Sequence, residues 1–157
     1  MPDTPDFLAR RLRSDGKKMT AYFDGLDDDA WMQTVYTEGS KWSVRNVLAH
    51  FVTSEQAFLK LFANILEGGS GASEDFDVDR YNARQQEKTE ALIPEDLLIQ
   101  YQEVRAAMVA WVETLVEDDL EKEGRHPFLG ETTLAEMIKL VYRHNQIHYR
   151  DIRKGAK

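Results

Sequence analysis

The sequence predicts an all-α protein, a four-helix bundle whose helices run up, down, down and up. Three observations support this fold class. Four long segments repeat apolar residues at three- and four-residue steps, capping residues mark their ends, and the connection between the second and third segments is long. Alternation of apolar and polar residues, which would indicate a β-sheet, is not sustained along the sequence.

The first two helices are expected over residues 7–23 and 44–66. Gly25 ends the first helix, and Ser43 is a good N-cap for the second, which the pair Gly68 and Gly69 stops. Each helix carries an apolar stripe on one side, as a helix that packs against a core requires. In the first helix this stripe consists of Leu8, Leu12, Met19, Tyr22 and Phe23.

The third and fourth helices are expected over residues 94–116 and 134–153. Pro94 occupies a first-turn position of the third helix, where its missing N–H costs nothing. The fourth helix begins with a capping box of Thr133 and Glu136 and is closed near Gly155. Some 27 residues separate the second and third helices, and their polar stretch 77–92 has the composition of a short extra helix. A connection of this length suggests a crossover.

Composition places the chain among single-domain proteins without disulfides. Its 157 residues are 42% hydrophobic, which is enough for one core, and we assign residues 1–157 to a single domain. The sequence contains no cysteine, so a bound metal ion would be held by nitrogen and oxygen atoms.

Charge and hydropathy lead to expectations about partners and location. The formal net charge of -8 repels nucleic-acid phosphates and anionic lipids, so we expect neither nucleic acid nor membrane as a partner. The N-terminal residues are acidic, and no stretch reaches the roughly 18 apolar residues of a membrane span. These features predict a cytoplasmic location.

Three of the four histidines lie in predicted core helices and form the candidate site. His144 and His148 are four residues apart and therefore share one helix face, about 6 Å from each other. His50 lies in the second helix among apolar neighbours. Burying three imidazoles is unfavourable unless their nitrogens find partners, and one shared metal ion gives each of them one. His126 is predicted to lie in a loop and is left out of the site.

The positions of these histidines also constrain the topology. His50 is near the start of its helix, whereas His144 and His148 are near the end of theirs. The side chains meet only if the two helices are antiparallel. In a plain up-down-up-down bundle the second and fourth helices are parallel, so the histidines favour the up-down-down-up order with the long crossover in the middle.

At three motifs the sequence resembles the DinB superfamily, also called YfiT-like metalloenzymes, over nearly its whole length. The motifs are WSVRNVLAH at residues 42–50, DFDVDRYN at 75–82 and HNQIH at 144–148. The resemblance implies a nickel or zinc ion on His50, His144 and His148, with water in the remaining positions. It also implies a small-molecule substrate, a low-molecular-weight thiol as co-substrate and a homodimer.

Three functional interpretations remain open at this point. In the first, the protein is an enzyme, a transferase, isomerase or hydrolase, whose metal ion activates water or a thiol. In the second, it is a stress-response or binding protein in which the metal ion only fastens two helices together. In the third, the bundle holds no metal.

Several polar residues near the histidines have open roles. Glu55, Tyr149 and Asp151 are close enough in sequence to orient a ligand histidine. Asn82 and Arg84 either roof the pocket or belong to a solvated helix face, which is the commoner fate of such a polar stretch.

Overall fold

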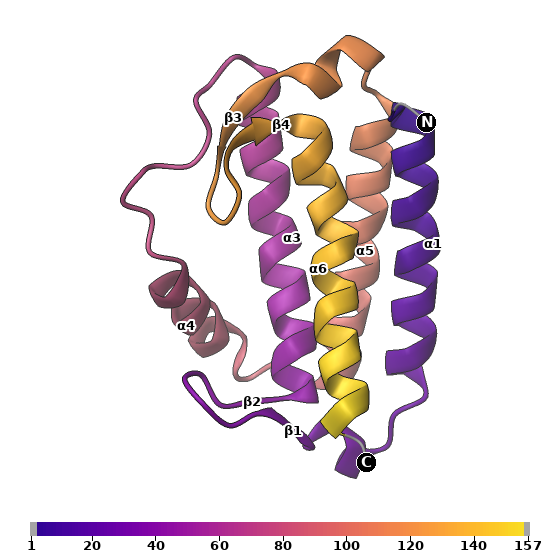
Figure 1. The fold of residues 1–157 in the computed structure, drawn as a ribbon. Helices are drawn as coiled ribbons and strands as arrows, with labels where there is room; N and C mark the ends of the chain where they lie inside the picture. Colours follow the sequence, from indigo (N-terminus) through magenta and orange to yellow (C-terminus); the bar gives the residue numbers. More distant parts are fainter. Residues whose placement is uncertain (1–2, 156–157) are drawn as a thin grey trace.

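Four long helices form the body of the molecule in a computed structural model that describes residues 3–155. They are α1 (Pro5–Asp24), α3 (Val44–Leu66), α5 (Pro94–Glu113) and α6 (Leu134–Gly155). Figure 1 shows α1 and α6 running in one direction and α3 and α5 in the other, which confirms the up-down-down-up bundle. The first and last two residues of the predicted domain lie outside the described part.

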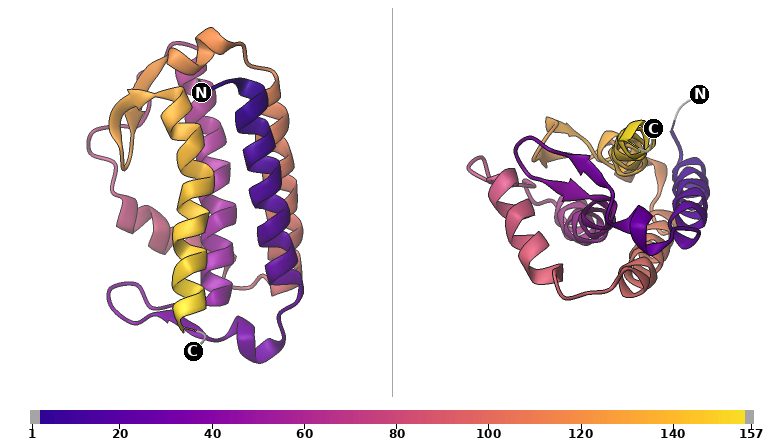
Figure 2. Two further views of the ribbon diagram at one scale, coloured as in Figure 1. Left: turned by 45° about the vertical axis from the view of Figure 1, so that its right-hand side comes forward. Right: turned by 90° about the horizontal axis from the view of Figure 1, so that it is seen from below.

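The four helices form a ring in which α1 neighbours α5 and α6, and α3 neighbours the same two helices. The view along the bundle in Figure 2 shows this arrangement. The crossover from α3 to α5 carries the predicted extra helix, α4 (Val78–Thr89), which packs against α3. Because α3 and α6 are antiparallel neighbours, the start of α3 lies beside the end of α6, where the histidines are.

The ends of the helices follow the capping signals of the sequence. At the start of α3, Asn46 Oδ1 accepts a hydrogen bond of 2.8 Å from the backbone N–H of Ser43, while Ser43 Oγ accepts one of 3.4 Å from that of Asn46. This capping box fixes the first turn of the helix that carries His50. The third helix ends at Glu113 instead of 116, because the chain turns there into a 3₁₀ helix, η1 (Glu117–Glu121).

The sequence did not predict the short elements that connect the helices. Strands of two to four residues are too short to establish an alternating pattern, so periodicity does not detect them. Two antiparallel strand pairs result, one at each end of the bundle (Figure 1). The elements are α2 (Asp28–Trp31), β1 (Thr34–Tyr36), β2 (Trp42–Ser43), β3 (Glu123–His126) and β4 (Gly130–Thr133).

The β3–β4 hairpin is held close against α3 and the crossover. A Cβ atom on Gly124 would lie 2.7 Å from the side chain of Ile65, so only glycine allows this approach. Gly71 forms a bridge to Arg125, and its φ of +89° also favours glycine. The hairpin is thereby docked with its tip over the side of α3 that carries the site.

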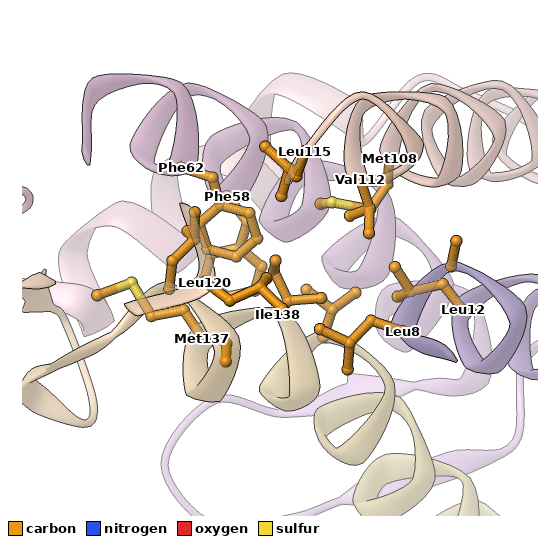
Figure 3. Packing of buried hydrophobic residues seen from close by; sticks show 14 of the residues in the cluster. Leu8, Leu12, Phe58, Phe62, Met108, Val112, Leu115, Leu120, Met137 and Ile138 are labelled. Carbon is orange, nitrogen blue, oxygen red and sulfur yellow. The ribbon is translucent and has the colours of Figure 1, made fainter. Parts of the chain in front are cut away.

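Apolar side chains from all four helices fill the bundle. Figure 3 shows the packing at one end, where Leu8 and Leu12 of α1 meet Ile138 of α6 and Met108 of α5. A second cluster near the other end includes Phe23, Phe51 and Tyr101. Among the described residues, no helix is both long and apolar enough to cross a membrane.

A buried ionic network interrupts this core and joins three helices. The guanidinium of Arg105 donates to both carboxylate oxygens of Glu55 at 2.8 and 2.7 Å, and to Asp15 at 2.9 Å. The three side chains are at most 5% exposed. Burial acts to lower the pKa of Arg105, but the Glu55 carboxylate outweighs it and raises that pKa, so the guanidinium is charged.

The fourth helix joins the network through Asn145. Its Nδ2 donates to Glu55 Oε2 and to the hydroxyl of Tyr101, both at 3.3 Å. Asn145 lies within the site in sequence, since it directly follows His144 and precedes His148. The network therefore ties α1, α3, α5 and α6 together one turn away from the candidate metal ligands.

Candidate metal centre

The structure brings His50, His144 and His148 together, although His50 and His144 are 94 residues apart in the chain. His144 Nε2 lies 2.9 Å from His50 Nε2 and 3.1 Å from His148 Nε2. His144 and His148 are placed by successive turns of α6, and His50 faces them from the second turn of α3. Three ring nitrogens thus point at one position between two helices.

The spacing of these nitrogens fits a shared ion. Imidazole nitrogens that bind one metal ion at about 2.0–2.1 Å are separated by roughly 2.9–3.4 Å, depending on whether the geometry is octahedral or tetrahedral. The two Nε2 distances fall at the octahedral end of this range. The ligand atoms of all three histidines lie within 4.8 Å of one another, so the group is compact enough to share one ion.

All three imidazoles are held in the neutral form that a ligand requires. Burial, followed by the neighbouring His144 and His148, lowers the pKa of His50 well below its usual value. Burial and His148 lower the pKa of His144 to about 3, and burial lowers that of His148 to about 4. A metal ion therefore does not compete with an imidazolium proton near neutral pH.

A hydrogen-bonded chain from Asp151 through Tyr36 orients His148. The Tyr36 hydroxyl donates to Asp151 Oδ2 at 2.6 Å, and its oxygen lies 2.7 Å from His148 Nδ1. Because the phenol proton is given to the carboxylate, Nδ1 must carry the proton that it donates to Tyr36. The lone pair of His148 is therefore on Nε2, the nitrogen that faces the other two histidines.

Tyr36 is well suited to hold this chain in place. Burial and the hydrogen bond to Asp151 raise its pKa far above the usual value, so it stays a neutral hydroxyl. His50 has a comparable partner, since Ser54 Oγ lies 3.2 Å from His50 Nδ1. The indole ring of Trp42 closes one side, with its centroid 4.8 Å from that of His50.

Two cavities of about 180 and 270 Å³ adjoin the histidines. Both are lined by His50, Val78, Asn82 and Phe128, so α3, α4 and the tip of the β3–β4 hairpin form their walls. The lining is mostly apolar, and Asp79 is its only charged side chain among the described residues. A larger hollow of about 710 Å³ lies between α1 and α5 and contains none of the three histidines.

The structure decides the open roles of the polar residues near the site. Asp151 orients His148, whereas Glu55 pairs with Arg105 and makes no contact with a histidine of the group. Asn82 lines both cavities, but Arg84 is exposed and lines neither. Tyr149 stacks edge-on against Tyr22 on the side of α6 that faces α1.

His126 is outside the group of three, as expected, but it is not in a loop. It ends strand β3 and is 1% exposed, so the expectation of a loop position was wrong. Its Nδ1 accepts from the backbone N–H groups of Phe128 and Leu129, and burial lowers its pKa to about 4. His126 is thus a structural residue that shapes the hairpin tip.

Sequence reasoning missed Tyr36, Trp42 and Phe128 as parts of the site. Tyr36 is 112 residues from His148 and lies in a three-residue strand, so no local signal connects the two. Phe128 lies in the loop at the hairpin tip, and a loop has no periodicity from which its position could be predicted. Trp42 precedes the cap of α3 and is part of a motif already quoted, which was the one available hint.

Comparison with known proteins yields both a family and a set of similar folds. The family model described as the DinB superfamily matches residues 5–152. YfiT from Bacillus subtilis, described as a probable metal-dependent hydrolase with an unusual four-helix bundle topology, is similar with a TM-score of 0.78 and 20% identity. That match covers 97% of this chain and 85% of YfiT. None of the curated proteins matches the chain in sequence.

Two further solved structures share the fold. An uncharacterised protein from Escherichia coli UTI89 has a TM-score of 0.74 and 17% identity, over 99% of this chain and 94% of that one. The colibactin self-resistance protein ClbS, solved in complex with a dsDNA, has a TM-score of 0.78 and 16% identity, over 100% of this chain and 98% of ClbS.

The ClbS complex corrects the expectations about partners. The exclusion of nucleic acid was wrong, because a protein of this fold has been solved on double-stranded DNA. The physical error lies in the use of net charge. A sum of -8 over the whole molecule does not describe how the charges are distributed, and binding to a polyanion depends on the local field of one face.

Proposed function

The chain belongs to the DinB superfamily, and we propose that it is a metal-dependent enzyme in which His50, His144 and His148 hold one divalent ion. The observation that carries this proposal is the convergence of three neutral Nε2 atoms beside a cavity. The description of YfiT as a probable metal-dependent hydrolase supports a metal-dependent role for this fold. Nickel and zinc both suit three imidazole ligands.

Three neutral ligands leave the ion its full double charge and leave coordination positions free. A bound divalent ion would supply Lewis acidity, lowering the pKa of a water molecule or a low-molecular-weight thiol toward neutrality. In this proposal Tyr36 and Asp151 keep the lone pair of His148 directed at the ion. Trp42 packs against His50, and Phe128 lines the cavity beside it.

The cavity lining indicates what kind of substrate reaches the site. Its apolar walls and the absence of a cationic side chain among the described lining residues favour a neutral, largely apolar group. Hydrolysis of such a substrate, or transfer of a thiol to it, is the reaction class we propose. The alternative is a structural ion that only joins α3 to α6 and catalyses nothing.

Cobalt substitution separates these two functions. The protein is stripped with a chelator, reloaded with Co²⁺ and titrated with a small thiol while the visible spectrum is recorded. We expect one ion per chain and a change in the spectrum, because an open position lets the thiol sulfur bind. In parallel, neutral aryl esters are expected to be hydrolysed by the metal-loaded protein and not by the stripped protein. A stoichiometric ion whose spectrum does not respond to thiol, with no hydrolysis, would establish the structural alternative.

Tyr36→Phe tests the orienting chain without touching a ligand. Loss of the hydroxyl removes the partner of His148 Nδ1, and we expect metal affinity to fall roughly 10–100-fold. Competition with a chromogenic chelator measures this affinity. Asp151→Asn should act through the same chain, so the two changes together should cost less than the sum of both.

Tyr142→Phe is the matched control for that experiment, because Tyr142 is a buried tyrosine of α6 outside the histidine group. Its metal affinity should equal that of the unmodified protein. Equal affinity of Tyr36→Phe and the unmodified protein would show that His148 needs no orienting partner.

A further inference from the structure

Positive charge is concentrated on two of the four bundle helices. Of the chain's 20 basic and 28 acidic residues, α1 and α6 together carry ten basic and five acidic ones. The other parts of the chain therefore contain ten basic and 23 acidic residues. The two basic helices are parallel neighbours that lie side by side in the left view of Figure 2. The excess of acidic residues thus lies outside α1 and α6.

A hollow of about 390 Å³ lies on this face between α1 and α6. Four of its six lining residues are cationic and none is acidic: Lys18, Gln146, Tyr149, Arg150, Arg153 and Lys154. The α6 members recur at three- and four-residue steps, so they share one side of that helix. We call these six residues the basic groove.

The cations of the basic groove are exposed and largely free of acidic partners. Among the described residues, Lys18, Arg153 and Lys154 have no carboxylate within salt-bridge distance, and Arg150 has only a long contact of 3.9 Å to Asp151. Asp151 itself is bonded to Tyr36. Four adjacent cations with so few counterions repel one another and attract a polyanion.

The ring of Tyr149 lies close to two of these cations. Lys18 Nζ and Arg153 Cζ lie 5.1 and 5.7 Å from the centre of its ring. The cations at the end of α6 also complement the helix dipole, but Lys18 comes from a different helix, which the dipole does not explain. Residues from both α1 and α6 therefore line the groove.

We propose that the basic groove binds the phosphate backbone of a nucleic-acid duplex. Basic side chains of α6 from Arg143 to Lys154 extend over about 16 Å of helix, a length that runs beside about five phosphates of one strand. Arginine guanidinium groups match phosphate geometry. Tyr149 is already in contact with two cations and with the ring of Tyr22, so it is poorly placed to stack on a base, and a duplex fits better than a single strand.

The groove also lacks the features of a membrane-binding surface. None of its six lining residues is a large aliphatic side chain or a tryptophan that would insert between lipids. This surface is separate from the cavity beside the histidines, since the two share no lining residue. We therefore expect binding of the duplex to require no metal ion.

Fluorescence anisotropy with a labelled 20-base-pair DNA duplex tests the proposal. With four phosphate contacts, the slope of log K against log salt should be about -3.6, and the Kd at about 50 mM salt should be micromolar. The measurement is made with and without stoichiometric zinc, and both should give the same Kd. No binding by the unmodified protein at low salt would overturn the proposal.

Two double variants with the same change in net charge localise the contact. Lys18→Glu with Arg153→Glu should weaken binding at least tenfold and reduce the salt slope by about 1.8. The control pair is Lys60→Glu with Lys88→Glu, on α3 and α4. It should leave the Kd and the salt slope unchanged, apart from a small general repulsion. Equal weakening in both pairs would mean that the groove is not the binding surface.

Two further measurements test whether the groove binds another kind of anion instead of the duplex. Inorganic phosphate that displaces the duplex far better than chloride of equal ionic strength would assign the groove to a small anion instead. Tighter binding to vesicles rich in anionic lipid than to the duplex would assign it to a membrane. Under the proposal, phosphate and chloride act alike and the duplex binds more tightly than the vesicles.

Discussion

Replacing His50, His144 or His148 by alanine is expected to lower the affinity for a divalent metal ion by roughly two orders of magnitude. A structural zinc ion contributes roughly 10–16 kcal/mol through four ligands, so one imidazole is worth on the order of 3 kcal/mol. The structure places the Nε2 atoms of all three within reach of one ion. Isothermal titration of chelator-stripped protein with Zn²⁺ measures the loss.

His126→Ala is the control for this series because His126 is a buried histidine outside the group. It should bind one ion with the affinity of the unmodified protein, although loss of its ring contact with Phe58 will lower its stability somewhat. An unchanged metal content in the His50 variant, with circular dichroism confirming the fold, would exclude the three-histidine site.

The same ion should stabilise the fold. It joins positions 94 residues apart, and a ligand that binds only the folded chain raises the melting temperature as its concentration exceeds the Kd. Each histidine variant should lose this rise. The comparison of melting curves in metal and in chelator therefore reports on the site even if no reaction is ever found.

Local patterns explain why so much of the fold was predictable. A three- and four-residue apolar repeat and a cap are properties of neighbouring residues, so the start of α3 at Val44 and of α6 at Leu134 follow from sequence alone. The pair His144 and His148 is likewise a local signal. His50 could be added only through the inference that α3 and α6 are antiparallel, which the bundle topology confirms.

What escaped prediction depends on contacts between distant residues. Tyr36 reaches His148 across the β1–β2 hairpin, and nothing near Tyr36 in the sequence marks it as a partner. Glu55 was considered as a residue that orients a histidine, yet Arg105, 50 residues away, pairs with it instead. A charged residue on an apolar helix face does not reveal which partner neutralises it. Only the assembled bundle does.

Glu55→Ala is expected to lower the free energy of unfolding by about 3–5 kcal/mol, one of the largest effects available in this chain. The change leaves Arg105 with its buried guanidinium facing a cavity, and Asp15 alone contacts only one of its nitrogens. It also removes one partner of Asn145. Urea unfolding followed by circular dichroism measures the difference.

Arg13→Ala is the matched control, because Arg13 and Glu113 also form an ion pair between α1 and α5 but are about half exposed. Water screens that pair, so its loss should cost less than about 1 kcal/mol.

Replacing Glu55 and Arg105 together by leucine and methionine separates the cost of an unpaired charge from the value of the pair. Burying two charges requires their desolvation, which their attraction only partly offsets, so the double variant should be markedly more stable than Glu55→Ala. Asp15 then loses its partner, and this unpaired carboxylate accounts for the stability that the double variant still lacks relative to the unmodified protein. If the double variant were as unstable as Glu55→Ala, the network would be needed as a whole to hold α3, α5 and α6 in register. In that case the position of His144 beside Asn145 would depend on it, and metal affinity should fall together with stability.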